Sequence, residues 1–146
     1  LVTVTGASNV TGEALPLDRV HFLGHVLHAD FINLMRLSSA HLYLTYPFVL
    51  SWSMLEAMAC GVTLVASDTR PVTEVVDHGD NGLLVPFHNP AAVAAGLATA
   101  LDMPEGERVR MRAAARRTVL DRYDLDRVCL PAWMGMLQRE FGVPRP

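Results

Sequence analysis

The residues of this chain with the greatest potential for chemistry lie between Thr45 and Glu74, each a few positions beyond an apolar segment. They combine carboxylates, hydroxyl groups and a phenol: Tyr46, Ser51, Ser53, Glu56, Asp68, Thr69 and Glu74. A carboxylate can accept two hydroxyl protons at once, with charge-assisted strength. These residues are therefore the candidates for binding a ligand.

The apolar segments before these residues predict strands, and the segments between the strands have helical spacing. Strands are expected at 1–6, 20–23, 41–45, 62–67 and 83–85, and helices near 30–39, 51–60, 72–77, 89–101, 105–120 and 126–141. Asn89 is expected to cap the helix at 89–101, with Pro90 at its first helical position. Alternation of strands and helices predicts an α/β fold, a Rossmann-like parallel sheet with helices on both faces. Ligands of such sheets bind beyond the carboxyl ends of the strands, where the polar residues fall.

The helix near 51–60 is expected to start just after a strand. Its free N–H groups and the positive end of its dipole would face the crevice, which suits a diphosphate. His25 follows the strand at 20–23 and is a further candidate for this crevice, with a solvated loop histidine as the alternative. Tyr46, Phe48 and Trp52 form an aromatic loop that is either a sugar contact or an apolar cover for the sheet edge.

Structural alternatives exist for both glutamates. Ser53 and Glu56 have the S-x-x-E spacing of a capping box, in which Glu56 would bond back to the backbone N–H of Ser53. Glu74 is expected in the first turn of its helix, where it could either approach the crevice or favour the helix dipole. The segment 77–82 reads as a turn with Gly or Asn in the left-handed region and no catalytic duty.

Length and composition predict one domain over residues 1–142, followed by a frayed tail at 143–146. The chain has 146 residues and a net charge of −3, so it offers no field for nucleic acid. No apolar run approaches the ~18 residues of a membrane span. The two cysteines, Cys60 and Cys129, lack metal-binding spacing and are expected to be reduced thiols in a cytoplasmic protein.

Two other site types are disfavoured. His21, His25 and His28 are close in sequence, but no cluster of acidic or cysteine residues completes a metal site, so no metal is expected. The segment VTVTGASNVTG is similar to the cofactor turn of short-chain dehydrogenases. However, Val10 replaces the middle glycine and no Y-x-x-x-K pair follows, which leaves a glycine-rich turn.

The ordered run LEAMACGVTLVASDTRPVTEVVDHGDNGLLVPFHNPAAVAAGLATAL carries a family resemblance over residues 20–101. It resembles the carboxyl-terminal, donor-binding half of retaining GT-B glycosyltransferases of the family 4 type. The resemblance implies half of a GT-B fold that binds a nucleotide-diphosphate sugar without a metal cofactor. It also implies that Glu56 accepts hydrogen bonds from the nucleotide ribose, and that a backbone segment just before Glu56 contacts phosphate.

The chain departs from the family pattern at two places. The family's first Glu, which holds hydroxyls of the transferred sugar, is Phe48 here, and an aromatic ring cannot accept those hydrogen bonds. The loop of Tyr46 and Phe48 then either binds the sugar differently, through backbone groups of Val49, Leu50 and Ser51, or belongs to a weakened or inactive site. The family's first strand in this domain, with its phosphate-binding Arg and Lys, and the amino-terminal acceptor domain are expected to lie outside this chain.

The resulting interpretation is the donor-binding domain of a retaining glycosyltransferase, inactive alone and completed by an amino-terminal acceptor-binding domain. Two alternatives remain open. One is a non-catalytic nucleotide-sugar-binding or partner module derived from such an enzyme. The other is an unrelated doubly wound nucleotide-binding domain.

Overall fold

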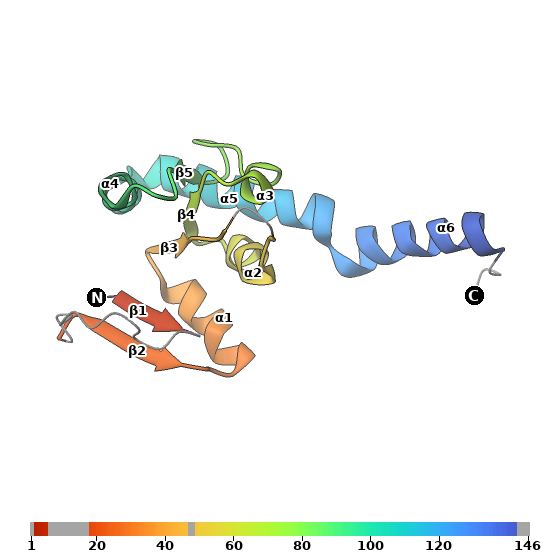
Figure 1. Cartoon of the computed structure of the whole chain (residues 1–146), viewed down its shortest axis with the longest axis horizontal. Coiled ribbons are helices and arrows are strands. Elements are labelled where there is room, and N and C mark those ends of the chain that lie inside the picture. The colour runs from red at the N-terminus through yellow and green to blue at the C-terminus, as the bar shows by residue number, and fades with distance from the viewer. Residues whose placement is uncertain (1, 6–17, 47–48, 143–146) are drawn as a thin grey trace. The chain divides into compact units, whose positions relative to one another are not determined.

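The computed structural model describes residues 2–5, 18–46 and 49–142 of the chain. Strands and helices alternate through most of its length, as Figure 1 shows. The chain divides into two compact units, Leu1–Leu34 and Met35–Pro146, which are described separately.

The first unit contains a pair of parallel strands. Strand β1, Val2–Thr5, pairs with β2, Val20–Gly24, in a register that aligns Val2 with Val20. Gly24 ends β2 with a φ of 60°, a conformation that favours glycine. Helix α1, His28–Leu37, follows and extends across the boundary into the second unit. The two strands predicted from the sequence are confirmed.

The second unit contains a three-stranded parallel sheet in the order β3-β4-β5. Its strands are β3, Ala40–Tyr43, β4, Thr63–Ser67, and β5, Leu83–Val85. Tyr43 is aligned with Ala66, and Ser67 with Val85. Because the strands are parallel, the loops that follow all three emerge at one edge. The three predicted strands of this unit are confirmed.

Helices cover both faces of this three-stranded sheet because β4 is apolar on both sides. Leu64 and Ala66 belong to a core with α2, Trp52–Cys60, and α3, Arg70–Thr73. Val65 belongs to a second core with α4, Pro90–Asp102. Helices α2 and α4 accordingly lie on opposite sides of β4 (Figure 1). This arrangement confirms the predicted α/β class, since successive strand residues point to opposite faces.

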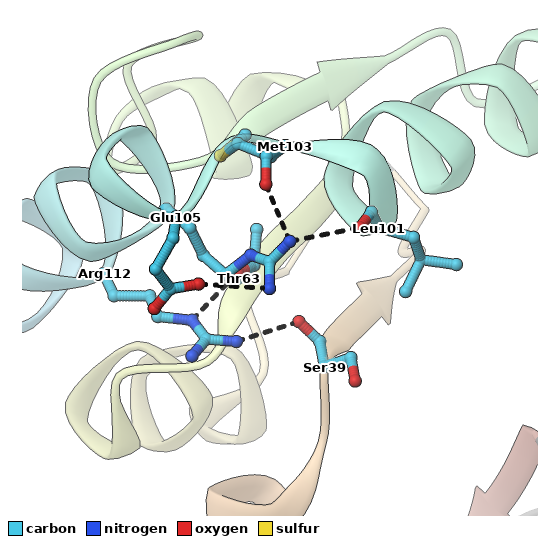
Figure 2. A network of polar contacts seen from close by, with 7 residues as sticks. Ser39, Thr63, Leu101, Met103, Glu105 and Arg112 are labelled. Carbon is cyan, nitrogen blue, oxygen red and sulfur yellow. Dashed lines mark hydrogen bonds and ion pairs between the residues drawn. The ribbon is translucent and has the colours of Figure 1, made fainter.

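The long helix α5, Glu105–Tyr123, contributes to both cores through Met111 and Ala115. Its arginines donate to carbonyls at the ends of other elements. Arg108 donates to Leu101 O and Met103 O after α4, and Arg112 donates to Ser39 O and to Thr63 Oγ1 (Figure 2). Further along, Arg116 donates to Ala59 O of α2. Guanidinium donors thus satisfy carbonyls that helix and strand ends leave without partners.

The chain continues beyond α5 through a π-helical turn, Leu125–Cys129, into α6, Leu130–Phe141. The sequence predicted one helix near 126–141 and missed the π-helical turn. Asp124 caps that turn by accepting from Arg127 N at 2.8 Å. No helix in the described part of the chain is long and apolar enough to cross a membrane. The predicted frayed tail lies outside the described residues, and the single-domain prediction remains a prediction.

Of two local predictions, the position of the short helix is wrong, and the left-handed glycine in the turn after it is confirmed. The short helix is α3 at Arg70–Thr73, not 72–77, and Glu74 is its C-cap residue. Glu74 therefore lies at the negative end of the helix dipole, because Pro71, directly after Arg70, starts the helix early. In the turn that follows, only Gly79 among the described residues 77–82 has positive φ, at 81°. Asn81 is instead buried, and its side chain bonds Val75 O, Asp77 N and Thr118 Oγ1.

Candidate functional site

The candidate site lies at the edge of the three-stranded sheet where β3, β4 and β5 end. Helix α2 begins there with Ser51 as its N-cap, whose Oγ accepts from Ser53 N at 3.3 Å. Ser51 N in turn donates to the phenol oxygen of Tyr43 at 2.8 Å. Tyr43 is the last residue of β3 and is buried, so the strand end holds the start of α2 in place. The predicted helix start is confirmed within one residue.

Glu56 lies in the second turn of α2 and is half-buried. The capping-box alternative for this residue is wrong, because the N-cap is Ser51 and the third helical residue is Met54. Ser53 lies inside the helix, with its Oγ 3.0 Å from the Oγ of Ser51. The ribose contact implied for Glu56 remains a prediction, now without that structural competitor.

Hydroxyl groups connect the loops after β3 and β4. The buried Ser67 Oγ accepts from Thr45 N at 3.3 Å and lies 3.3 Å from Thr69 Oγ1. Thr45 Oγ1 donates to Val49 O, which closes the loop between β3 and α2. Thr69, predicted as a ligand contact, is 8% exposed and bonded within this group. Its side chain therefore supports the loops.

The loops after β4 and β5 are joined through Asp68. Its backbone N donates to Val85 O at 2.9 Å, and its Oδ1 accepts from Phe87 N at 3.3 Å. Asp68 is exposed, so its carboxylate also reaches solvent. A carboxylate has about four acceptor positions, and a single backbone N–H leaves capacity for a ligand.

Aromatic side chains gather beside this carboxylate. The ring centroids of Tyr46 and Phe87 are 5.3 Å apart, and those of Phe87 and His88 are 4.7 Å apart. An open hollow of about 500 Å³ lies next to them. It is lined by Asp68, Thr69, Arg70, Pro86, Phe87, His88 and Asn89.

The sequence analysis missed Arg70, Phe87 and His88. The strand before Phe87 has only three residues, and the segment after it was interpreted through the cap of α4. That interpretation of Asn89 is confirmed, because its Oδ1 accepts from Ala92 N at 3.0 Å. The signal that could have identified Phe87 and His88 is their position, since they follow a parallel strand at the same edge as Tyr46 and Asp68.

The structure brings several of the predicted residues together and displaces Glu74. Tyr46, Val49, Leu50, Ser51 and Ser53 lie on the loop and first turn between β3 and α2. Glu74 is displaced to the far end of α3, where its carbonyl accepts from Arg122. His25 belongs to the first unit, after β2, and Phe48 lies outside the described residues.

Metal ligation needs grouped ligands, and thiol chemistry needs an accessible thiolate. Within the described ranges, no three His, Cys, Asp or Glu residues are grouped to hold a metal ion. Burial raises the pKa of the Cys60 thiol, which disfavours a thiolate there. Burial also lowers the pKa of His41, a residue of β3, so that its neutral form is favoured.

The sequence pattern of the family Glycosyl transferases group 1 matches residues 7–118. The chain belongs to this family. The match covers both units and every loop of the candidate site, and it agrees with the parallel sheet and its flanking helices.

Curated relatives and solved structures agree with this assignment. Glycogen synthase of Mycobacterium tuberculosis is 30% identical over 105 residues, which is 72% of this chain and 25% of the relative. Sucrose-phosphate synthase of Thermosynechococcus elongatus superposes with a TM-score of 0.71 at 26% identity, covering 86% of this chain and 31% of that one. Anabaena HepE in complex with UDP gives 0.70 at 25% identity, with 82% and 32% covered. The chain thus spans about a quarter to a third of these proteins.

Proposed function

We propose that this chain is the donor-binding domain of a retaining glycosyltransferase that takes its sugar from a nucleotide-diphosphate sugar. The observation that carries the proposal is the start of α2 at the strand-end edge, with Glu56 one turn further along. Membership of the glycosyltransferase family and the UDP bound by Anabaena HepE support the choice of ligand.

The geometry supports specific duties for these residues. The first turn of α2 presents backbone N–H groups beside Ser51, and a helix N-terminus stabilises anionic oxygens through its N–H groups and dipole. Glu56, half-buried on the same helix, accepts hydrogen bonds from the ribose hydroxyls. Stabilisation of the leaving diphosphate is then the main contribution of this domain to catalysis. The reaction needs no metal cofactor in this proposal.

Turnover requires more than this chain. The acceptor must be oriented against the anomeric carbon of the donor, and we assign that duty to an amino-terminal domain. Its presence is supported by the coverage of the relatives, of which this chain spans about a quarter to a third. A cytoplasmic location belongs to the same proposal, supported by the free thiols of Cys60 and Cys129.

One observation favours a second candidate function, a nucleotide-sugar-binding module without catalytic activity. Phe48 occupies the position of the sugar-binding Glu implied by the family resemblance. Loss of that carboxylate removes the acceptor for the hydroxyls of the transferred sugar.

Calorimetry with uridine and guanosine diphosphates tests the proposal. We expect one of them to bind the chain, and Glu56→Gln to weaken that affinity about 10- to 150-fold, as for loss of a charged hydrogen-bond acceptor worth about 1.5–3 kcal/mol. Gln has a similar helix propensity, so the free energy of unfolding should change little. Glu140→Gln, an exposed change on α6, is the matched control. Unchanged affinity in a folded Glu56→Gln variant would remove Glu56 from the site.

The catalytic part is tested on the protein that includes the upstream domain. Sugar transfer or donor hydrolysis that is lost in Glu56→Ala supports the enzyme, and NMR of the product should show the anomeric configuration of the donor retained. Tight donor binding with no turnover of any common nucleotide sugar would favour the binding module instead.

A further inference from the structure

We propose that the hollow beside Asp68 is a saccharide-binding subsite, in which Asp68 supplies the carboxylate and Phe87 supplies the apolar wall, with the ring of Tyr46 packed against Phe87. This inference deepens the proposed function and rests on it for the source of the sugar. It assigns sugar recognition to residues that the sequence analysis either placed elsewhere or missed.

The topology of the sheet creates the apolar wall. Strands β3 and β5 are not neighbours, since β4 lies between them. Their backbones are therefore separated by about 10 Å, two strand spacings. Tyr46 follows β3 and Phe87 follows β5, yet their rings approach to 5.3 Å. The two side chains thus meet across the end of β4, directly beside the residue that follows it, Asp68.

The wall is accessible to a ligand. Tyr46 is 64% exposed and Phe87 is half-buried, with His88 packed edge-on against the Phe87 ring. Aromatic rings offer a flat apolar face, which matches the C–H face of a pyranose ring. Pockets that orient a small ligand combine such faces with a few convergent polar groups.

The polar groups around the hollow suit hydroxyls. Asp68 accepts one backbone N–H, from Phe87, and this bond fixes the carboxylate against the loop that carries the aromatic wall. The remaining acceptor positions can take a pair of vicinal hydroxyls. Arg70 and His88 line the same hollow and add donor groups for ring or hydroxyl oxygens. The carboxylate of Asp68 and the guanidinium of Arg70 offset each other in charge, so the hollow suits a neutral sugar.

The subsite also supplies a carboxylate in place of the one that the chain lacks at Phe48. In the resemblance, the carboxylate for the sugar precedes α2, on the loop after β3. Here the available carboxylate, Asp68, lies after the adjacent strand β4 at the same edge. The sugar could belong to the donor or to an acceptor saccharide, and the two sources are distinguished by experiment.

Amide NMR spectra of the chain, recorded without any nucleotide, test the subsite. Titration with methyl α-D-glucopyranoside, methyl α-D-mannopyranoside and methyl N-acetyl-α-D-glucosaminide should shift the amides of Asp68, Phe87 and His88 for at least one glycoside. Asp68→Asn keeps the acceptor for Phe87 N and should weaken that binding about five- to tenfold, as expected when a charged acceptor becomes neutral. Asp80→Asn, on the loop that leads into β5 at the opposite edge, is the matched control. Phe87→Leu keeps the apolar volume and should also reduce binding.

Calorimetry then identifies the source of the sugar. A donor sugar in the subsite makes UDP-glucose or GDP-mannose bind more tightly than the matching diphosphate, and Asp68→Asn should abolish that difference. An acceptor saccharide leaves the two affinities equal, while glycosides still shift the three amides with the diphosphate bound.

The outcomes for this inference and for the proposed function are separable. Glycoside shifts without any nucleotide binding would support the subsite and reject the donor-domain function. A second outcome is that a nucleotide binds, no glycoside shifts the three amides, and the nucleotide sugar binds no more tightly than the diphosphate. This outcome would overturn the subsite and leave the donor-domain function intact. Shifts of Phe87 and His88 by uridine diphosphate alone would assign the aromatic wall to the nucleobase and also overturn it.

Discussion

Gly96 offers a test of how α4 packs on the sheet that carries the site. It lies inside α4, Pro90–Asp102, where a glycine has no conformational need. A Cβ placed on it would lie 2.5 Å from Val85 Cγ1 and 3.3 Å from Val65 Cγ1. Both valines are buried strand residues, at 5% and 0% exposure. Gly96→Ala should therefore force α4 away from β5.

The expected magnitude follows from two opposing effects. Overpacking a filled core costs about 1–3 kcal/mol, and a contact of 2.5 Å against a β-branched side chain belongs at the upper end of that range. Alanine gains about 1 kcal/mol over glycine in a helix interior. The net change in the free energy of unfolding should be a loss of about 2 kcal/mol.

Urea unfolding followed by circular dichroism measures this change. Gly106→Ala in α5 is the matched control, because a Cβ there would meet nothing within 4 Å. That variant should be neutral or more stable by up to about 1 kcal/mol. Equal effects of the two substitutions, or a gain in stability for Gly96→Ala, would refute the close approach of α4 to the sheet.

Two further predictions concern buried polar residues. Asn81→Ala should lower the free energy of unfolding by about 2–3 kcal/mol in urea unfolding, because the buried side chain loses three hydrogen bonds, one of them to Thr118 of α5. A loss below about 1 kcal/mol would contradict their contribution. His41 has a pKa lowered from 6.5 by burial, so the unfolded chain binds its proton more readily. Stability should therefore fall as the pH drops below 6.5, more steeply than in His41→Gln, and parallel pH profiles of the two proteins would contradict this.

Local patterns allowed the strands, most helices and the cap of α4 to be predicted from the sequence. Continuous apolar segments such as Val62–Ser67 are buried on both faces of a parallel sheet, which is the condition that produces them. The order β3-β4-β5 could not be predicted, because strand pairing depends on contacts distant in sequence. The early start of α3 at Arg70 was missed because a proline fixed its first turn.

The candidate site was predictable only in part. Ser51, Ser53 and Glu56 follow from the family resemblance and from the strand before α2. The contact between Tyr46 and Phe87 joins segments about forty residues apart, after strands that are not neighbours. The spacing of hydrophobic residues along the sequence cannot indicate such a contact, because the contact arises from the order of strands in the sheet.

The central claim is that a nucleotide diphosphate binds at the carboxyl edge of the three-stranded sheet. Titration of the chain with uridine and guanosine diphosphates, followed by amide NMR, tests this claim most directly. The account predicts that one of them shifts the amides of Ser51, Trp52, Ser53 and Glu56, at the start of α2, while those of Asp80 and Gly82 at the opposite edge stay unchanged. Shifts confined to the opposite edge, or no shifts with either nucleotide, would contradict it.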